Sequence, residues 1–344
     1  MIFNWQSNQW RRFLDLTQKL PHALLLHGPR GVGKFEFAKA AANFLLCQRA
    51  AAGLSQACGE CGTCLLLAQG NHPDFFLIQP ESESAEAAEG EAEQAAAEKK
   101  KKPSKQIKIS QIRDLLDSIQ TGTHQGGRRV ILLAPAESMN TATANALLKT
   151  LEEPPPDTVM LLVSSEPDRL LPTIRSRCQG LAFGEPEPAL ALAWLKEAEV
   201  ADAANLLARY GGAPLLALAA ATEESGLDFD VLIAGLATPR DPLACADAMS
   251  GAEPVAVVDG MQRWVSDLIT FGLAGNVRYF PGHTATISTV AKSASPVALL
   301  RFSRRLVELR AIAQFPVNPR LFAERLALDY ADAVETSPRL EAVE

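Results

Sequence analysis

Hydrophobic and polar positions follow two alternating periods in the first half of the chain. Short apolar runs, each typical of a buried strand, occur at Ala23–Leu26, Phe75–Ile78, Val130–Leu133 and Val159–Val163. Between these runs the apolar residues repeat at helical spacing, over Lys34–Leu46, Ser110–Gln120 and Thr141–Glu153. Strands that alternate with helices are typical of a mostly parallel sheet with helices on both faces. The pattern therefore predicts an α/β domain.

The pattern changes after Gly184-Glu185-Pro186-Glu187-Pro188, a segment with the composition of a linker. The expected elements beyond it are all helices: Ala189–Ala198, Ala201–Arg209, Pro214–Thr222, Phe229–Leu236, Pro242–Met249, Val255–Leu273, Pro296–Ala313 and Pro319–Val334. Glycines interrupt the series at Gly211-Gly212 and at Gly226. We therefore expect three domains: an α/β domain over 1–185, a small helical domain over 186–226 and a larger helical domain over 227–344.

One segment of the first half, Glu81–Lys105, fits neither period. It consists almost entirely of Glu, Ala, Ser and Lys, and it contains the run Lys99–Lys102. Because it has no large apolar residue to anchor it, we predict a disordered surface insertion at about 81–105. A run of lysines is most often a solvated feature, and a contact with nucleic acid or a partner is the alternative.

Composition and charge narrow the class of protein. Of the 344 residues, 47% are hydrophobic and 21% are charged, and the formal net charge is −7. An acidic chain lacks the basic footprint of a protein that binds DNA strongly by itself. No apolar stretch approaches the length of a membrane span, and the N-terminus lacks the pattern of a signal peptide. We therefore expect a cytoplasmic protein whose contacts with nucleic acid are local or shared with partners.

A phosphate-binding loop follows the first expected strand. Gly28, Gly31, Gly33 and Lys34 belong to the pattern G-x-x-x-x-G-K, which here lies between a strand and a helix as its function requires. Glycines let backbone N–H groups turn toward a phosphate, and the helix N-terminus adds positive partial charge. Lys34 would reach the terminal phosphates of a bound nucleotide.

Both protein groups that would hold magnesium are missing from this pattern. An active site needs Ser or Thr after the lysine, and the chain has Phe35. The strand Val130–Leu133 is followed by Ala134-Pro135 instead of an acidic pair, and the nearest carboxylate is Glu137. We therefore expect no ATP hydrolysis. Two interpretations stay open: a structural turn, and a site that binds ATP without hydrolysing it.

Four of the six cysteines form a metal-binding pattern. Cys58, Cys61 and Cys64 follow the spacing C-x2-C-x2-C, and Cys47 precedes them by ten intervening residues. This spacing suits a structural zinc ion with four thiolate ligands and no open coordination position. An iron–sulfur cluster is the alternative, but the ferredoxin pattern continues with a further Cys-Pro that is absent here. We expect the isolated Cys178 and Cys245 to be small buried apolar residues.

These motifs occur together with further segments that are typical of one family. The segments are Pro21–Gly28 leading into the loop, the four cysteines, Asn71–Asp74, His124–Val130, Ala144–Pro155, Ile174–Cys178 and Gly211–Pro214. With them the first 215 residues resemble bacterial clamp-loader subunits of the AAA+ class, and most closely the delta-prime family of DNA polymerase III. The Asn-Ala-Leu-Leu-Lys-Thr-Leu-Glu-Glu-Pro-Pro run and the Ser-Arg-Cys triplet are the most specific segments. Beyond 215 the resemblance rests on length and helicity alone.

The resemblance implies a fold and a role. It implies an AAA+ type P-loop domain with an inserted zinc module, then a helical lid and an all-α collar domain for oligomerisation. Such a subunit joins gamma or tau motor subunits and delta in a five-membered ring, which uses ATP to load the sliding clamp onto primed DNA. Delta-prime is typically the non-hydrolysing stator, so the chain would belong to a polymerase holoenzyme without catalysing a reaction itself. Arg177 would act in trans as an arginine finger.

Two other functions compete with this interpretation. The chain is an active motor subunit if Glu137 serves as an unusual metal ligand or base. It is a zinc-containing nucleic-acid-binding protein if the clustered lysines, instead of partner subunits, provide the contact with DNA. Departures from the motor pattern at Phe35 and at Ala134-Pro135 favour the stator.

Overall fold

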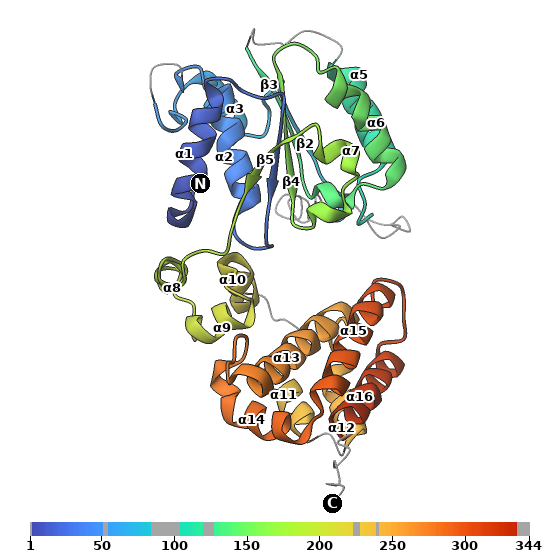
Figure 1. Cartoon of the computed structure of the whole chain (residues 1–344). Coiled ribbons are helices and arrows are strands. Elements are labelled where there is room, and N and C mark those ends of the chain that lie inside the picture. The colour runs from blue at the N-terminus through green and yellow to red at the C-terminus, as the bar shows by residue number, and fades with distance from the viewer. Residues whose placement is uncertain are drawn as a thin grey trace, which may run out of the picture. The chain divides into compact units, whose positions relative to one another are not determined.

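The computed structural model describes residues 2–50, 54–83, 104–119, 127–222, 228–238 and 241–335. The chain divides into two compact units, Met1–Leu190 and Ala191–Glu344 (Figure 1). Most of the insertion expected at about 81–105 lies outside the described residues, so its disorder stays a prediction.

A parallel sheet forms the centre of the first unit. Its described strands are β1 (Ala23–His27), β2 (Phe75–Ile78), β3 (Arg129–Leu133), β4 (Thr158–Ser164) and β5 (Gln179–Ala182), in the order β2-β3-β4-β1-β5. Every neighbouring pair is parallel. The four expected strands are confirmed. The strand β5 was not expected, because this edge strand buries Leu181 alone and so presents no apolar run.

Helices cover both faces of this sheet, as the sequence pattern predicts. The elements α1 (Ser7–Thr17), α2 (Lys34–Leu46) and α3 (Gly62–Ala68) lie on one side, and α5 (Ile109–Ile119), α6 (Thr141–Glu152) and α7 (Pro172–Arg175) lie on the other (Figure 1). Successive strand residues point to opposite faces. Leu24 and Leu26 therefore join the core under α1 and α2, whereas Leu25 joins the core under α5 and α6. Continuous apolar strands arise from this two-sided burial.

The parallel strands bring three connections to one edge of the sheet. The loop after β1 leads into α2, the segment after β3 contains the short helix η3 (Ala136–Ser138), and β4 is followed by Ser165 and η4 (Pro167–Arg169). Carboxyl ends of parallel strands form the edge where ligands usually bind in such folds. This edge therefore contains the phosphate loop.

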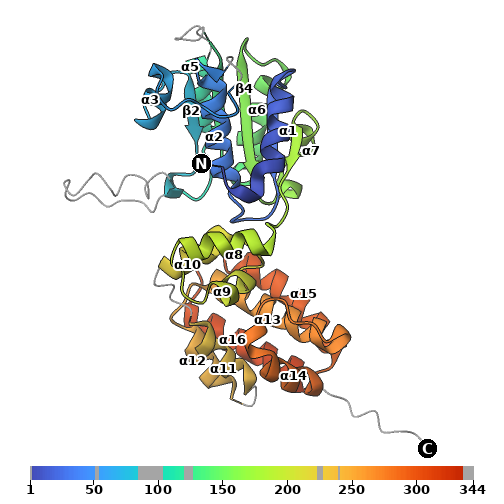
Figure 2. The same cartoon turned by 90° about the vertical axis from the view of Figure 1, so that its left-hand side faces the viewer.

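The second unit is helical throughout its described residues. Its elements are α8 (Pro188–Glu197, which begins in the first unit), α9 (Ala203–Arg209), α10 (Pro214–Thr222), α11 (Phe229–Ala237), α12 (Pro242–Met249), α13 (Pro254–Ala274), η5 (Pro281–His283), α14 (Thr284–Ser293), α15 (Pro296–Ile312) and α16 (Pro319–Glu335) (Figure 2). The expected helices are confirmed to within a few residues. The helix α14 was not expected, and neither were α1 and α3 in the first unit. The α/β class followed by an all-α part is confirmed.

Two cores lie within this helical unit. A small one gathers α8 to α10 around Leu195 and Leu207, and a larger one gathers α11 to α16. In the larger core Trp264 Nε1 donates to Tyr330 Oη at 2.9 Å, and that hydroxyl donates to the carbonyl of Leu236 at 2.9 Å. The three-domain division at 185/186 and 226/227 stays a prediction, because the two helical cores belong to one compact unit.

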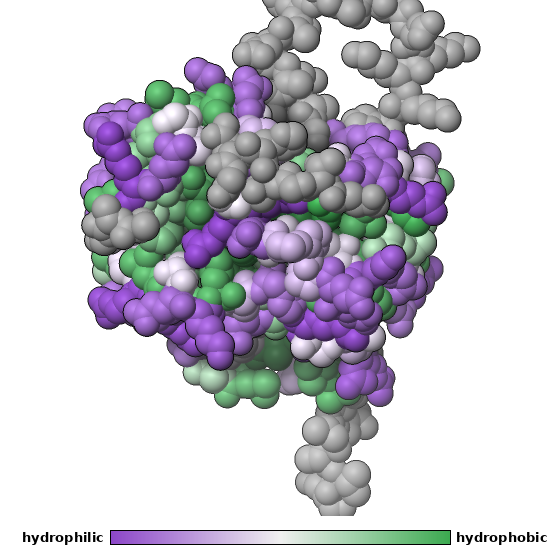
Figure 3. Space-filling view, turned by 90° about the horizontal axis from the view of Figure 1, so that it is seen from above, coloured by the Kyte–Doolittle hydropathy of each residue, from purple (hydrophilic) through white to green (hydrophobic). Residues whose placement is uncertain are grey.

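Hydrophilic residues cover most of the face seen from above, with hydrophobic ones in small groups between them (Figure 3). Among the described residues, no helix combines the length and the apolar character that crossing a membrane needs.

Candidate functional site

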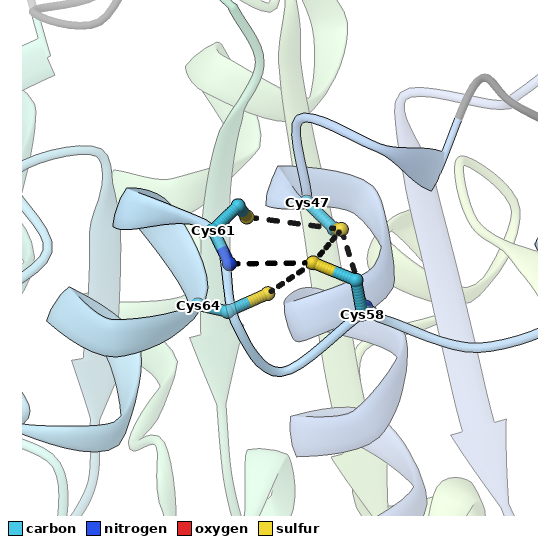
Figure 4. A group of neighbouring side chains, drawn as sticks. All are labelled: Cys47, Cys58, Cys61 and Cys64. Atoms are coloured by element: carbon cyan, nitrogen blue, oxygen red, sulfur yellow. Dashed lines mark hydrogen bonds between the residues drawn. The ribbon is translucent and has the colours of Figure 1, made fainter.

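The four expected metal ligands meet at the end of α2 and the start of α3. Cys47 immediately follows α2, and Cys61 is the residue before the first turn of α3, which contains Cys64. Cys58 lies in the connecting loop (Figure 4). All four sulfur atoms lie within 4.8 Å of one another. The structure thus brings together the whole predicted ligand set.

Their spacing matches a tetrahedral metal site. The Sγ atoms of Cys47 and Cys58 are 3.6 Å apart, those of Cys47 and Cys61 are 4.0 Å apart, and those of Cys58 and Cys64 are 3.9 Å apart. Zinc–sulfur bonds of about 2.3 Å in a regular tetrahedron give sulfur–sulfur edges of about 3.8 Å. A disulfide would need about 2 Å. The cluster therefore fits a four-thiolate metal ion and contains no disulfide.

Hydrogen bonds around the sulfurs favour thiolates. Backbone N–H groups of Cys58 and Cys61 approach the Sγ atoms of Cys47 and Cys58 at 3.4 Å, and Thr63 Oγ1 lies 3.1 Å from Cys61 Sγ. Although burial by itself opposes the charge, the Thr63 hydroxyl and the backbone lower the pKa of Cys61 to about 5. Burial raises the pKa of Cys64. The thiols therefore differ in how readily they lose a proton. A metal cation would displace the protons that remain on the sulfur atoms.

The other two cysteines stand apart from this cluster. Burial raises the pKa of Cys178 and that of Cys245 to about 11, so both stay protonated and unreactive at neutral pH. Cys245 is buried as predicted, whereas Cys178 is half-buried.

The phosphate loop has the expected local structure. It connects β1 to α2, and its glycines adopt positive φ angles: +146° at Gly28, +71° at Gly31 and +88° at Gly33. Residues with a Cβ rarely adopt these angles, which accounts for glycine at these positions. The strand, loop and helix predicted from the motif are thus all present.

Lys34 points into its own loop. Its Nζ donates to the carbonyl oxygens of Gly28 at 2.8 Å and Pro29 at 2.5 Å, and to Ser165 Oγ at 3.0 Å. Only 5% of Lys34 is exposed. Burial lowers the pKa of its ammonium group to about 8, an effect that the charge of Glu137 partly offsets. The cation that would bind phosphate is thus hydrogen-bonded to the protein itself.

The N-terminal segment closes the loop from outside. Gln6 Nε2 donates to the carbonyls of Val32 at 3.0 Å and Gly33 at 2.8 Å, and Trp5 Nε1 donates to that of Val32 at 3.1 Å. A Cβ atom placed on Gly33 would lie 2.6 Å from the ring of Phe3. Phe3 and Gln6 therefore lie directly against the loop.

Phe35 follows the loop lysine, at the position where an ATPase has a hydroxyl that binds magnesium. Phe35 contributes its ring to a contact with the Lys39 ammonium at 4.4 Å. After β3, no carboxylate occurs before Glu137 in η3. The fold nevertheless brings Glu137 back toward the loop, because its Oε1 accepts from the backbone N–H of Ser165 at 3.0 Å. This approach of Glu137 to the loop was not expected, because in the sequence Glu137 lies beyond the end of β3.

Arg177 lies between the ends of two helices on the α5–α7 side of the sheet. Its Nη2 is 2.6 Å from Glu152 Oε1, and its Nη1 donates to the carbonyl of Thr173 at 3.0 Å. Its side chain is 35% exposed. Neither Glu152 nor Thr173 belongs to the phosphate loop, so the two predicted sites do not meet through these contacts.

Several site residues escaped the sequence analysis. Phe3 and Gln6 close the loop, Ser165 binds the lysine, and Glu152 binds the arginine. One signal was present for the first pair: Phe3, Gln6, Trp10 and Phe13 recur at spacings of three and four, as in a helix that packs on one face. No local signal links the other two to their partners, which are distant in sequence or in another element.

Comparison with known proteins identifies the family. The family model described as "DNA polymerase III, delta subunit" matches residues 6–187. The DNA polymerase III subunit delta' of Yersinia pestis is 31% identical over 97% of this chain and 96% of its own length. That of Pseudomonas aeruginosa is 47% identical over 63% of this chain and 60% of its own length. The subunit delta' of Escherichia coli is 33% identical over 58% of this chain and 54% of its own length.

The matched region contains the loop, the cysteine cluster and Arg177, all described above. One of the relatives matches along nearly the whole of both chains. The resemblance inferred from the motifs is thereby confirmed, and the chain belongs to the DNA polymerase III delta-prime family.

Proposed function

We propose that the chain is the stator of a cytoplasmic DNA polymerase III clamp loader, a subunit that does not hydrolyse ATP. It would assemble with gamma or tau motor subunits and with delta, and the ring would place the sliding clamp on primed DNA. Membership of the delta-prime family supports the proposal that the chain assembles into this complex. The observation that supports the stator role is the closed phosphate loop, in which Lys34 donates hydrogen bonds to the loop's own carbonyl oxygens.

The closed loop argues against turnover in three ways. Its lysine donates to Gly28, Pro29 and Ser165. Phe35 offers no hydroxyl for magnesium, and phosphoryl transfer depends on metal and positioning. A nucleotide would also have to open a loop against which Phe3 and Gln6 are packed. We infer that the loop is a structural turn, which is one of the two interpretations that the motif leaves open.

The cysteine module has a structural role in this proposal. Four cysteine ligands would complete the coordination of zinc and leave no position for a substrate. The ion would join the end of α2 to α3. It would hold together a loop that otherwise has a small core.

Exposed apolar residues on α15 and just after it form a surface that is suitable for assembly with other subunits. Val297, Leu300 and Val307 lie on one face of α15 and are 57%, 50% and 64% exposed. Phe315 follows at 70% exposure. Exposed apolar residues in a row are typical of a surface that contacts another protein. We infer that this face takes part in oligomerisation of the collar.

Arg177 is the catalytic group that the chain would supply. A guanidinium is permanently charged and planar, and it can stabilise the charge that develops on phosphate bound by a neighbouring subunit. Such a finger contributes about 10³–10⁵ in rate in well-studied GTPases. The rate at the one ATP site that faces this chain would therefore depend on Arg177.

The experiment compares two variants of this chain in a reconstituted clamp loader. We expect Arg177→Ala to lower DNA-stimulated ATPase and clamp loading, and Lys34→Met to leave both unchanged. Arg175→Ala is the matched control, because Arg175 is the neighbouring arginine and pairs with Asp168 at 2.8 Å. Loss of activity with Lys34→Met in an intact ring would favour the motor subunit with Glu137. Full activity with Arg177→Ala would contradict the finger.

A further inference from the structure

The guanidinium of Arg177 is held at both of its terminal nitrogens. Nη2 lies 2.6 Å from Glu152 Oε1, and Nη1 donates to the carbonyl oxygen of Thr173 at 3.0 Å. Glu152 is the last residue of α6, and Thr173 belongs to α7. Two elements therefore fix the plane of the guanidinium, one through a charge and one through a backbone carbonyl.

The position of Glu152 is unfavourable for its own helix. Carbonyl groups at a helix C-terminus carry negative partial charge, so a carboxylate there is repelled and a cation is attracted. Lys149 already lies in the last turn of α6. Glu152 thus gains its favourable electrostatic contact from Arg177 and not from the helix that contains it.

The neighbours of both residues make different contacts. Glu153 has the same charge one position later, yet its side chain makes no hydrogen bond or ion pair with any described residue. Arg175 pairs with Asp168, whose side chain is 91% exposed. The contact between Glu152 and Arg177 is thus specific to this pair within the two motifs.

The contact leaves Arg177 available to a second anion. A guanidinium carries several N–H donors in a fixed fork, and the two contacts use one on each terminal nitrogen. The side chain of Arg177 remains 35% exposed and that of Glu152 51% exposed. An ion pair this exposed is too weak to withhold the arginine from a triphosphate, which carries more charge than one carboxylate. Its effect is therefore to restrict orientation, since a free arginine samples many rotamers.

We propose that Glu152 is a positioning residue for Arg177, holding the guanidinium in the orientation in which it meets the phosphates of a neighbouring subunit. This inference rests on the proposed arginine finger. It assigns a function to Glu152, the first glutamate of the Leu-Glu-Glu-Pro-Pro run. The second glutamate, Glu153, takes no part in the contact with Arg177.

The test uses the reconstituted clamp loader with Glu152→Gln in this chain. A finger acts on the transition state, so we expect kcat of DNA-stimulated ATPase to fall about two- to fivefold, as an exposed ion pair allows, with KM for ATP unchanged. Glu153→Gln and Asp168→Asn are the matched controls and should keep the full rate. Thermal unfolding and gel filtration establish that each variant is folded and assembled.

A double variant separates this inference from the function on which it rests. Because Glu152 acts through Arg177, Glu152→Gln should have no further effect once Arg177→Ala is present. An unchanged ATPase rate with Arg177→Ala alone would show that Arg177 is not an arginine finger. A reduced rate with Arg177→Ala, but an unchanged or increased rate with Glu152→Gln, would overturn the positioning role and leave the finger intact. A loss from Glu152→Gln that persists in the double variant would also overturn it.

Discussion

Removal of zinc from the cysteine module should unfold that module and leave the sheet folded. The module contains a small core, in which Cys47, Cys61 and Cys64 are buried and only small residues pack against them. Burying three small side chains supplies roughly 3–5 kcal/mol. Structural zinc in small peptides supplies about 10–16 kcal/mol. A zinc ion bound by the four cysteines would therefore contribute about three times as much as the burial of their side chains.

Local secondary structure cannot replace the ion. The helix α3 has 7 residues, and isolated helices shorter than about 12 residues are marginal in water. The sheet has its own two cores, which contain none of the four cysteines. Loss of the metal should thus remove the order of the described residues between Cys47 and Ala68 without cooperative unfolding of the first unit.

Hydrogen exchange measured with and without a strong chelator tests this expectation. Amides of α3 should lose protection, whereas those of β3 and β4 should keep it. Trp10 is a second reporter, because its Nε1 donates to the carbonyl of Ser55 at 2.7 Å and its emission should shift. Cys61→Ser should have the same effect. Elemental analysis should find one zinc per purified chain. Iron in its place, or full protection of α3 after complete metal removal, would refute the reasoning.

Two further predictions concern buried charges. The pKa of Lys34 falls from 10.5 to about 8 on folding, so between these pH values the unfolded chain binds more protons, and the free energy of unfolding should rise with pH by at most about 3 kcal/mol. Urea titrations at pH 8 and pH 10 should show this rise in the wild-type chain and not in Lys34→Met; an equal rise in both would contradict it. Asp267 is fully buried and accepts backbone N–H bonds from Arg278 at 2.9 Å, Tyr279 at 2.9 Å and Phe280 at 2.8 Å. Asp267→Ala should lower the free energy of unfolding by about 3–5 kcal/mol in a urea titration, because three N–H groups lose their acceptor, and a change below 1 kcal/mol would show that water replaces the carboxylate.

Local patterns in the sequence were sufficient to predict most of the architecture. Two-sided burial makes β1, β3 and β4 continuously apolar, and helical periodicity marks α2 and α6, so each element is visible within its own residues. The cysteine ligands were equally accessible, because their spacing along the chain already limits how they can meet. Elements without such a signal were missed: β5 buries one residue, and α3 is short and starts at a glycine.

Contacts between residues far apart in sequence were decided only by the tertiary structure. The phosphate motif leaves open whether the loop binds ATP, and it does not show that Gln6 and Ser165, from other parts of the chain, hydrogen-bond to Gly33 and Lys34. Likewise, the Ser-Arg-Cys triplet indicates a finger, but its partner Glu152 belongs to α6. Local spacing determines which backbone conformations and ligand sets are available. Which side chains then satisfy a buried ammonium or orient a guanidinium depends on how the sheet brings distant segments to one edge, and no local pattern contains that information.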